Sequence, residues 1–163
     1  MLKSKWGQSY PFNAKTGYDY SGCVATAVAQ MMYYHQWPAQ GQGKNEYVVT
    51  YYQAKKSADF SQSHYDWANM LPDYRYPVQA TAVQNDAVAL LMSDVGVASF
   101  MQYRPSASGT QGVFAYQALQ KHFDYSAAYV TKAVEGPGGC RNPETGTAQR
   151  MSSVSETEQR NPR

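Results

Sequence analysis

Apolar and small residues are concentrated in one early segment of the chain, residues 22–35. The segment begins at Gly22, contains alanines and valines in its first half and methionines and tyrosines in its second, and has no Asp, Glu, Lys or Arg. Such a segment predicts a helix buried along much of its length, because small side chains allow close approach on several sides. Pro38 and Gly41 follow, so the helix is expected to end near Gln36.

A second helical pattern covers residues 79–95, where apolar residues recur at offsets of three, four and seven. We place Asp86 and Asp94 on the polar side of this helix and Gly96 at its C-terminal cap. A third helix is expected at residues 113–122. The folded part of the chain is therefore predicted to be mainly helical.

The remaining segments carry weaker patterns. Residues 47–52 form a short β-favouring run, and the residues that follow, with Lys55 and Lys56, are interpreted as a polar loop. Residues 1–21 show neither a two-residue nor a 3.6-residue period, which indicates an irregular loop.

Composition changes near residue 130. All 23 aromatic residues lie at or before Tyr129, and residues 134–163 are mainly Gly, Pro, Ser, Thr, Glu and Arg, with little to bury. A length of 163 residues suits one domain. We therefore predict a folded body at residues 1–130 and a disordered, unrelated tail at residues 131–163.

Charge and composition exclude several classes of partner. The net charge is +2, and no Lys/Arg cluster is interleaved with aromatic residues, so nucleic acid is not an expected partner. No apolar run approaches the roughly 20 residues that span a bilayer, and the N-terminus lacks the apolar core of an export signal. Two cysteines and three histidines show no zinc-ligand spacing, so we expect no metal and no other cofactor.

Cys23 carries the clearest chemical signal, because it follows Gly22 at the start of the first predicted helix. Unpaired backbone N–H groups and the positive end of the helix dipole favour a thiolate there. Cys23 is either a buried structural cysteine or a nucleophile, and the Gly-Cys boundary favours the second interpretation. Cys140 lies in a stretch without apolar neighbours, and a disulfide between the two cysteines is not expected.

Four blocks of sequence occur in an informative order. They are Trp-Gly-Gln-Ser-Tyr-Pro-Phe-Asn at 6–13, Gly-Cys-Val-Ala-Thr-Ala at 22–27, Tyr-Asp-Trp-Ala-Asn-Met-Leu-Pro at 65–72 and Leu-Met-Ser-Asp-Val-Gly at 91–96. Together they resemble the streptopain family of papain-like bacterial cysteine peptidases, which includes interpain- and periodontain-like enzymes. Phe12 stands where the family usually has tyrosine. The resemblance covers residues 2 to about 130.

The resemblance implies a papain-like α+β fold, of which this chain would supply the helix-rich half led by Cys23. It implies hydrolysis of peptide bonds in polypeptide substrates, with Cys23 as the thiolate nucleophile and Gln8 donating to the oxyanion beside the Cys23 backbone N–H. A Gly/Ser loop of the family lines the substrate cleft, so Ser108 is expected to contact substrate, although Arg104 replaces a usual glycine. The family is secreted and made with a propeptide; neither propeptide nor signal peptide is expected in this chain.

The catalytic histidine of the family has no match in the sequence. The family supplies it from a GGHAF-like segment and a supporting tryptophan from an NWGWGG-like segment, and the chain contains neither. His35 lies twelve residues after Cys23 on the same predicted helix, about 18 Å away. His64 matches no catalytic segment. His122 follows Cys23 by 99 residues, whereas a papain-type base follows its cysteine by about 130 to 150.

We therefore expect a truncated cysteine endopeptidase that lacks its catalytic histidine and the second half of its fold. The alternative is an inactive pseudopeptidase fragment that binds peptides or proteins without cutting them. A continuation of the reading frame that encodes the two missing segments would favour the first hypothesis.

Overall fold

The computed structural model describes residues 2–76 and 78–126. Within these ranges the elements are α1 (Cys23–His35), β1 (Lys44–Val49), β2 (Ala54–Asp59), the short 3-10 helices η1 (Phe60–Gln62) and η2 (Trp67–Asn69), α2 (Ala82–Ala98) and α3 (Gly112–His122). None of these helices has the length and apolar character needed to cross a lipid bilayer. Cys140 and the predicted tail at 131–163 lie outside the described residues.

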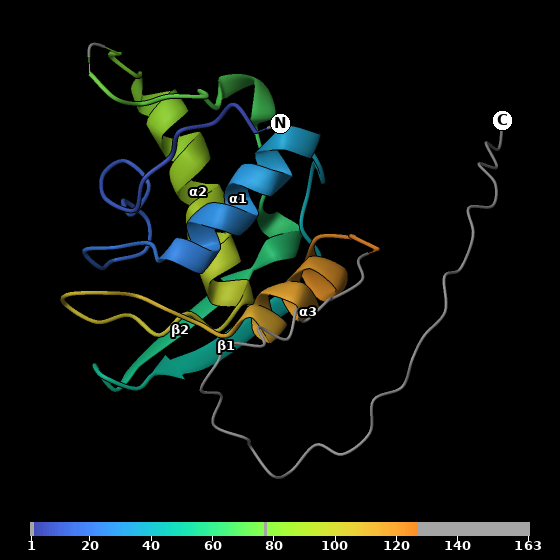
Figure 1. Ribbon diagram of the computed structural model, residues 1–163. Coiled ribbons are helices and arrows are strands. Elements are labelled where there is room, and N and C mark those ends of the chain that lie inside the picture. The colour runs from blue at the N-terminus through green and yellow to red at the C-terminus, as the bar shows by residue number, and fades with distance from the viewer. Residues whose placement is uncertain (1, 77, 127–163) are drawn as a thin grey trace, which may run out of the picture. The chain divides into compact units, whose positions relative to one another are not determined.

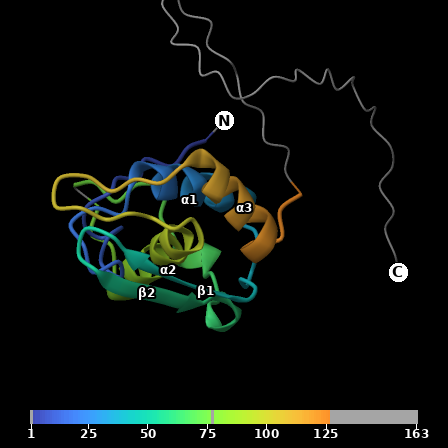
Figure 2. The ribbon, with the colours of Figure 1, turned by 90° about the horizontal axis from the view of Figure 1, so that it is seen from below.

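Helix α2 occupies the middle of the described part. Figure 1 shows α1 crossing α2 with the β-hairpin below them, and Figure 2 shows α2 nearly end-on, with the hairpin on one side and α1 and α3 on the other. Accordingly, α2 buries residues on several sides: Val88, Ala89, Leu91, Met92, Val95, Val97 and Ala98. Helix α1 buries a single stripe, Ala25, Thr26, Ala29 and Met32, and exposes Cys23 and Tyr34.

Both ends of α1 lie where the sequence predicts them. The helix begins directly after Gly22, which has φ 95° and ψ 140°. It ends at His35, because Gln36 adopts the left-handed conformation and its N–H bonds the carbonyls of Met32 and Tyr33. The predicted stop near Gln36 is confirmed.

Helix α2 begins and ends three residues later than predicted. Thr81 opens it with a capping box: its side chain accepts from the Gln84 N–H, and the Gln84 side chain accepts from the Thr81 N–H. Gly96 was predicted as the C-terminal cap, and this prediction is wrong, because the helix continues to Ala98. A side chain at Gly96 would collide with the Tyr103 hydroxyl, so this glycine makes room for a buried aromatic ring.

The prediction that Asp94 lies on the polar side of α2 is also wrong. Asp94 is buried, and its Oδ2 accepts a hydrogen bond of 2.9 Å from the Tyr65 hydroxyl. The Ser63 side chain also bonds to it. Burial raises the pKa of the Asp94 carboxyl above its ordinary value. Helical spacing alone could not reveal these partners, because they lie about 30 residues earlier in the chain.

We expect Asp94→Asn to change how stability depends on pH. A folded-state pKa above the unfolded value of about 3.9 means that the folded chain holds this proton more tightly. The resulting stabilisation is fully present below about pH 4 and is lost as the pH rises through the folded pKa. The wild-type free energy of unfolding should therefore fall relative to that of Asp94→Asn, by about 1.4 kcal/mol per unit of pKa elevation.

Urea denaturation between pH 4 and 8 measures this difference. The control is Asp86→Asn, because the Asp86 side chain is exposed. Its carboxylate lies 3.4 Å from the Lys15 ammonium. Parallel pH profiles for wild type and Asp94→Asn would contradict the prediction.

The segment after residue 52 is a strand, where the sequence predicted a polar loop. β2 pairs antiparallel with β1 in the register Lys44↔Asp59 to Val49↔Ala54. Its side chains alternate between half-buried and exposed. Lys56 lies on the half-buried side, where its ammonium donates to the Thr16 carbonyl (2.6 Å) and covers the Tyr18 ring. Backbone pairing with β1 and this lysine's aliphatic stem stabilise a strand that lacks an apolar pattern.

Candidate active site

Cys23 is the first residue of α1, and its side chain is exposed. No side chain caps this end of the helix. The backbone N–H groups of the first turn and the positive end of the helix dipole therefore remain next to the thiol. An accessible sulfur in this position suits a nucleophile better than a structural cysteine.

Gly22 is required directly before the cysteine for two reasons. Its φ of 95° lies in the region that side chains disfavour. In addition, a methyl group there would lie 2.6 Å from Met101 Sδ, 2.8 Å from Met101 Cε and 3.3 Å from the Ser108 carbonyl oxygen. Met101 is fully buried, so the chain approaches the core closely at the point where it presents Cys23.

Thr26, one turn into α1, joins the cysteine segment to the N-terminal loop. Its buried hydroxyl lies 3.0 Å from the Gly22 carbonyl and 3.3 Å from the Gly7 carbonyl, and can donate to either. The same oxygen lies 3.4 Å from the hydroxyl of Ser21. Thr26 therefore connects the residue before Cys23 with the residue before Gln8.

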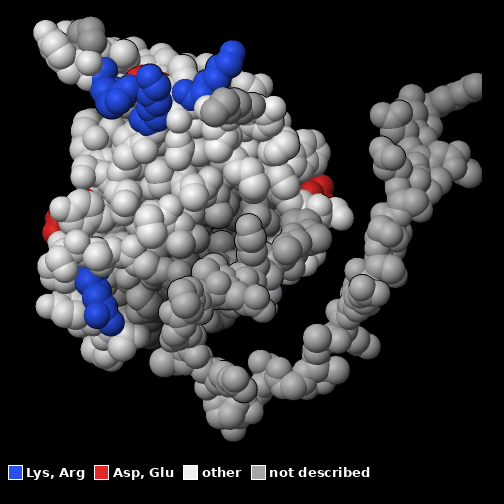
Figure 3. All heavy atoms as spheres, in the orientation of Figure 1, with Lys and Arg blue, Asp and Glu red and all other residues white. Residues whose placement is uncertain are grey.

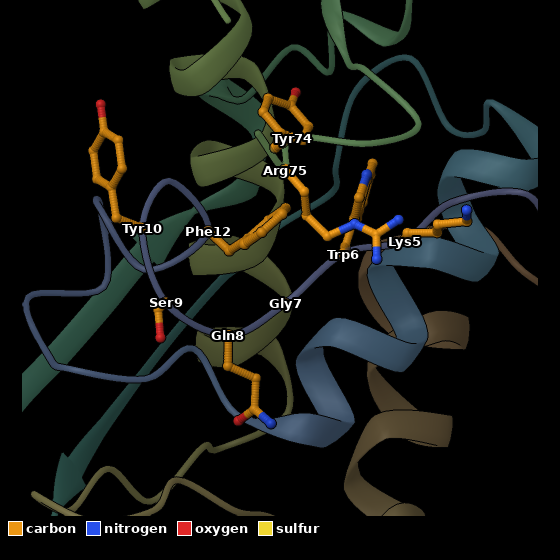
Figure 4. A pocket seen from close by; sticks show the side chains of 9 residues that line it. All are labelled: Lys5, Trp6, Gly7, Gln8, Ser9, Tyr10, Phe12, Tyr74 and Arg75. Carbon is orange, nitrogen blue, oxygen red and sulfur yellow. The ribbon is translucent and has the colours of Figure 1, made fainter. Parts of the chain in front are cut away.

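The backbone of Gln8 is held at the start of α1. Its carbonyl accepts a hydrogen bond of 2.9 Å from the Ser21 N–H, two residues before Cys23. On the other side, the Trp6 N–H donates to Gln30 Oε1 (3.3 Å) and the Trp6 indole donates to the Leu71 carbonyl (2.8 Å). In Figure 4 the Gln8 side chain points away from the aromatic rings of its neighbours. The backbone of Gln8 is thus held at Ser21, two residues before Cys23, and donation by its side-chain amide to an oxyanion at Cys23 stays a prediction.

Ser108 lies beside the same segment. It is buried, and its hydroxyl donates to the Tyr20 carbonyl at 2.9 Å. The loop that carries it is closed by a pair of backbone hydrogen bonds between Gln102 and Gly109. The observed role of Ser108 is thus to support the chain before Cys23, and its contact with substrate stays a prediction.

The sequence model of the Peptidase C10 family matches residues 6–141. The chain belongs to the Peptidase C10 family. Streptopain of Streptococcus pyogenes is 36% identical over 112 residues, which are 65% of this chain and 28% of streptopain. The thiol protease/hemagglutinin PrtT of Porphyromonas gingivalis is 31% identical over 139 residues, 79% of this chain and 16% of that protein.

The fold is similar to that of a solved member. The structure of active wild-type interpain A cysteine protease from Prevotella intermedia superposes with a TM-score of 0.68 at 35% identity, over 76% of this chain and 53% of that one. The predicted family and the predicted papain-like α+β fold are confirmed. The C10 chain spans about half of the interpain A structure and 28% of streptopain.

The three histidines of the C10 chain all lie in its described part. His35 ends α1, so Cys23 and His35 occupy opposite ends of the helix. His122 ends α3 and is buried, with Nδ1 2.9 Å from the Gln42 carbonyl and its ring 4.6 Å from that of Phe60. Burial lowers the pKa of His122, which favours a neutral ring that donates from Nδ1.

A hollow of about 500 Å³ adjoins Gln8 (Figure 4). It is lined by Lys5, Trp6, Gly7, Gln8, Ser9, Tyr10, Phe12, Tyr74 and Arg75. No group of three or more His, Cys, Asp or Glu in residues 2–76 and 78–126 could hold a metal ion; the absence of a metal from the whole protein stays a prediction.

Sequence reasoning named Cys23, Gln8 and Ser108, whose roles stay predictions, and did not name Thr26 or Arg75. Thr26 lies inside the matched cysteine block, and the position of its hydroxyl one turn after Gly22 was the available signal. Arg75 lies in no matched block. Only its spacing after Pro72, the end of the third block, could have drawn attention to it.

Proposed function

We propose that the chain is the nucleophile-bearing part of a cysteine endopeptidase that hydrolyses peptide bonds in polypeptides. Cys23 attacks the scissile carbonyl as a thiolate, and the developing oxyanion accepts hydrogen bonds from the Gln8 amide and the Cys23 backbone N–H. The observation that carries the proposal is the exposed cysteine at the first residue of α1, with Gln8 hydrogen-bonded through its backbone to Ser21.

We also propose that neither His35 nor His122 is the catalytic base. A base must come within roughly 3 Å of the thiol. His35 is about 18 Å from Cys23 along α1 at about 1.5 Å per residue, and the Nδ1 of His122 is bonded to Gln42. The imidazole that takes the thiol proton and later protonates the leaving amine is proposed to come from the part of the family fold that this chain does not span.

A second candidate function is peptide or protein binding without hydrolysis. The positions of His35 and His122 favour it, because a thiol without a base binds and reacts with electrophiles but does not turn over amides. An extracellular location is proposed for either function, on the resemblance to streptopain alone.

We expect iodoacetamide to alkylate Cys23 in the purified chain while hydrolysis of peptide substrates stays at background. Alkylation needs only an accessible thiolate, whereas hydrolysis needs a general acid and base. Intact-mass spectrometry of a Cys140→Ser variant measures the first reaction, and cleavage of labelled casein measures the second. Cys23→Ala should abolish labelling.

Two results would contradict the proposal. If Cys23 resisted alkylation in the folded chain, it would not be an available nucleophile. If the chain hydrolysed casein, and both Cys23→Ala and His122→Ala abolished this activity, the base would lie within the chain after all.

A further inference from the structure

We propose that Thr26 is a positioning residue for the oxyanion site, because its hydroxyl helps to set the direction in which the Gln8 side chain leaves the backbone. The inference rests on the function proposed above and deepens it by adding a residue to the same site. In this role Thr26 acts through residue 8 and makes no contact with the substrate.

Both peptide groups next to the Gln8 Cα are hydrogen-bonded to the segment around Cys23. The Gly7 carbonyl, on one side, accepts from the Thr26 hydroxyl at 3.3 Å. The Gln8 carbonyl, on the other side, accepts from the Ser21 N–H at 2.9 Å. Two attachments restrict both φ and ψ of Gln8, and these dihedrals set the direction of its Cα–Cβ bond relative to α1. With only the second attachment, the peptide group before Gln8 is free to turn.

The Thr26 hydroxyl has one proton and two carbonyl oxygens within reach. The Gly22 carbonyl, at 3.0 Å, already accepts from the Thr26 backbone N–H, also at 3.0 Å. The hydroxyl therefore adds little there, whereas its contact with Gly7 joins α1 to a residue 19 positions earlier in the chain. The Ser21 hydroxyl lies 3.4 Å from the same oxygen and can donate to it. Thr26 thus contacts both residues whose groups hold the Gln8 backbone.

The contact with Gly7 matters more for position than for stability. Gly7 is exposed, so water can satisfy its carbonyl when the Thr26 hydroxyl is removed. Trp6, one residue earlier, keeps its hydrogen bonds to Gln30 and Leu71, so the loop stays attached to the body. Loss of the hydroxyl therefore leaves a folded chain in which the direction of the Gln8 side chain is less restricted.

Charged side chains cannot orient the Gln8 loop directly against α1. Residues 6–14 and 20–43 contain no Asp, Glu, Lys or Arg. In Figure 3 the middle of the visible face, where Figure 1 places α1, shows neither basic nor acidic side chains. Hydrogen bonds such as that of Thr26 are therefore the directional contacts between these two segments.

The test compares Thr26→Val with Thr26→Ser in the Cys140→Ser chain. Valine keeps the branched shape and removes the hydroxyl, whereas serine keeps the hydroxyl. The probe is N-acetyl-trialanine aldehyde, which adds to the Cys23 thiol. The S–C bond forms and the thiol proton passes to the aldehyde oxygen, which then occupies the oxyanion site. Competition with iodoacetamide, followed by intact-mass spectrometry, measures the affinity for the aldehyde.

We expect Thr26→Val to weaken aldehyde binding about three- to tenfold, the effect of one ordinary hydrogen bond. Thr26→Ser should restore the affinity to within about twofold of the parent chain. The rate of alkylation by iodoacetamide alone should be unchanged in both variants, because that reaction forms no oxyanion.

A double-mutant cycle with Gln8→Ala assigns the effect to residue 8. Without the Gln8 amide, Thr26→Val should cause no further loss of aldehyde affinity, because no side chain remains to be oriented. Ser99→Ala is the matched control. The buried Ser99 hydroxyl donates to the Val95 carbonyl, four residues earlier, at 2.7 Å, as Thr26 can to Gly22. This control should lower stability in urea and leave aldehyde affinity unchanged.

Three results would overturn the inference: an aldehyde affinity unchanged by Thr26→Val, a loss that Thr26→Ser shares, or a loss that persists in full without the Gln8 amide. If Cys23 resisted alkylation, or if Gln8→Ala left aldehyde affinity unchanged, the proposed function would fail and the inference with it. An affinity that depends on Gln8 but not on Thr26 would overturn the inference alone, so the two failures are distinguishable.

Discussion

Gly22→Ala is expected to destabilise the folded chain by about 2–6 kcal/mol and to slow alkylation of Cys23. A side chain at a φ of 95° costs about 1–3 kcal/mol. The new methyl group would also lie 2.6 Å from Met101 Sδ, and overpacking of this kind costs about 1–3 kcal/mol. Relief of the contact would move the start of α1, and with it Cys23. Urea denaturation and the rate of iodoacetamide labelling measure the two effects.

Gly17→Ala separates the two contributions. Gly17 also has a positive φ, 78°, but a methyl group there would meet no atom within 4 Å. This variant should therefore show only the conformational cost, with normal labelling of Cys23. If Gly17→Ala and Gly22→Ala lost the same stability, the contact with Met101 would not be the reason for glycine before the cysteine.

Gln8→Ala is expected to weaken binding of a peptide aldehyde about 10²-fold, the lower end of the range for loss of one oxyanion donor. The aldehyde adds to the Cys23 thiol and forms a tetrahedral hemithioacetal, whose oxygen takes the place of the oxyanion. Iodoacetamide reacts by displacement and forms no such oxygen, so its rate with Cys23 should be unchanged. Competition between the aldehyde and iodoacetamide measures aldehyde affinity without any need for turnover.

Gln8→Glu is the matched variant, because it keeps the length of the side chain and replaces the donor by an acceptor. It should lose at least as much aldehyde affinity as Gln8→Ala. An aldehyde affinity that did not depend on residue 8 would remove Gln8 from the proposed mechanism, and the reactivity of Cys23 itself would still stand.

Local signals predicted the helices well. Gly22 and Pro38 frame α1, and the periodic apolar residues identified α2 to within three residues at each end. The errors concern features set by distant partners. The strand β2 forms because it pairs with β1. Position 96 is glycine because the Tyr103 hydroxyl leaves no room for a side chain there. No pattern within a short window contains that information.

The candidate site likewise contains residues that local sequence signals predict and residues that come together only through distant contacts. Cys23 and Gln8 were predicted because they lie in matched blocks of sequence, and the chemistry of a thiol at a helix start supports the prediction for Cys23. The hollow beside Gln8 was not predicted, because the bridge between Lys5 and Asp73, 68 residues apart, brings its lining residues together. Charges that meet only through such a bridge look unrelated in the sequence.

The hydrogen bonds around Thr26 have a consequence for assembly. They connect the first turn of α1 with the loop that carries Gln8. If a histidine-bearing segment docks as proposed above, the thiol and the backbone of Gln8 are already positioned, and the imidazole is the group that remains to be oriented. A docking error of about 1 Å would then slow proton transfer but leave oxyanion binding intact. Oxyanion binding and proton transfer would thus have separate tolerances, one set inside this chain and the other at its junction with the histidine.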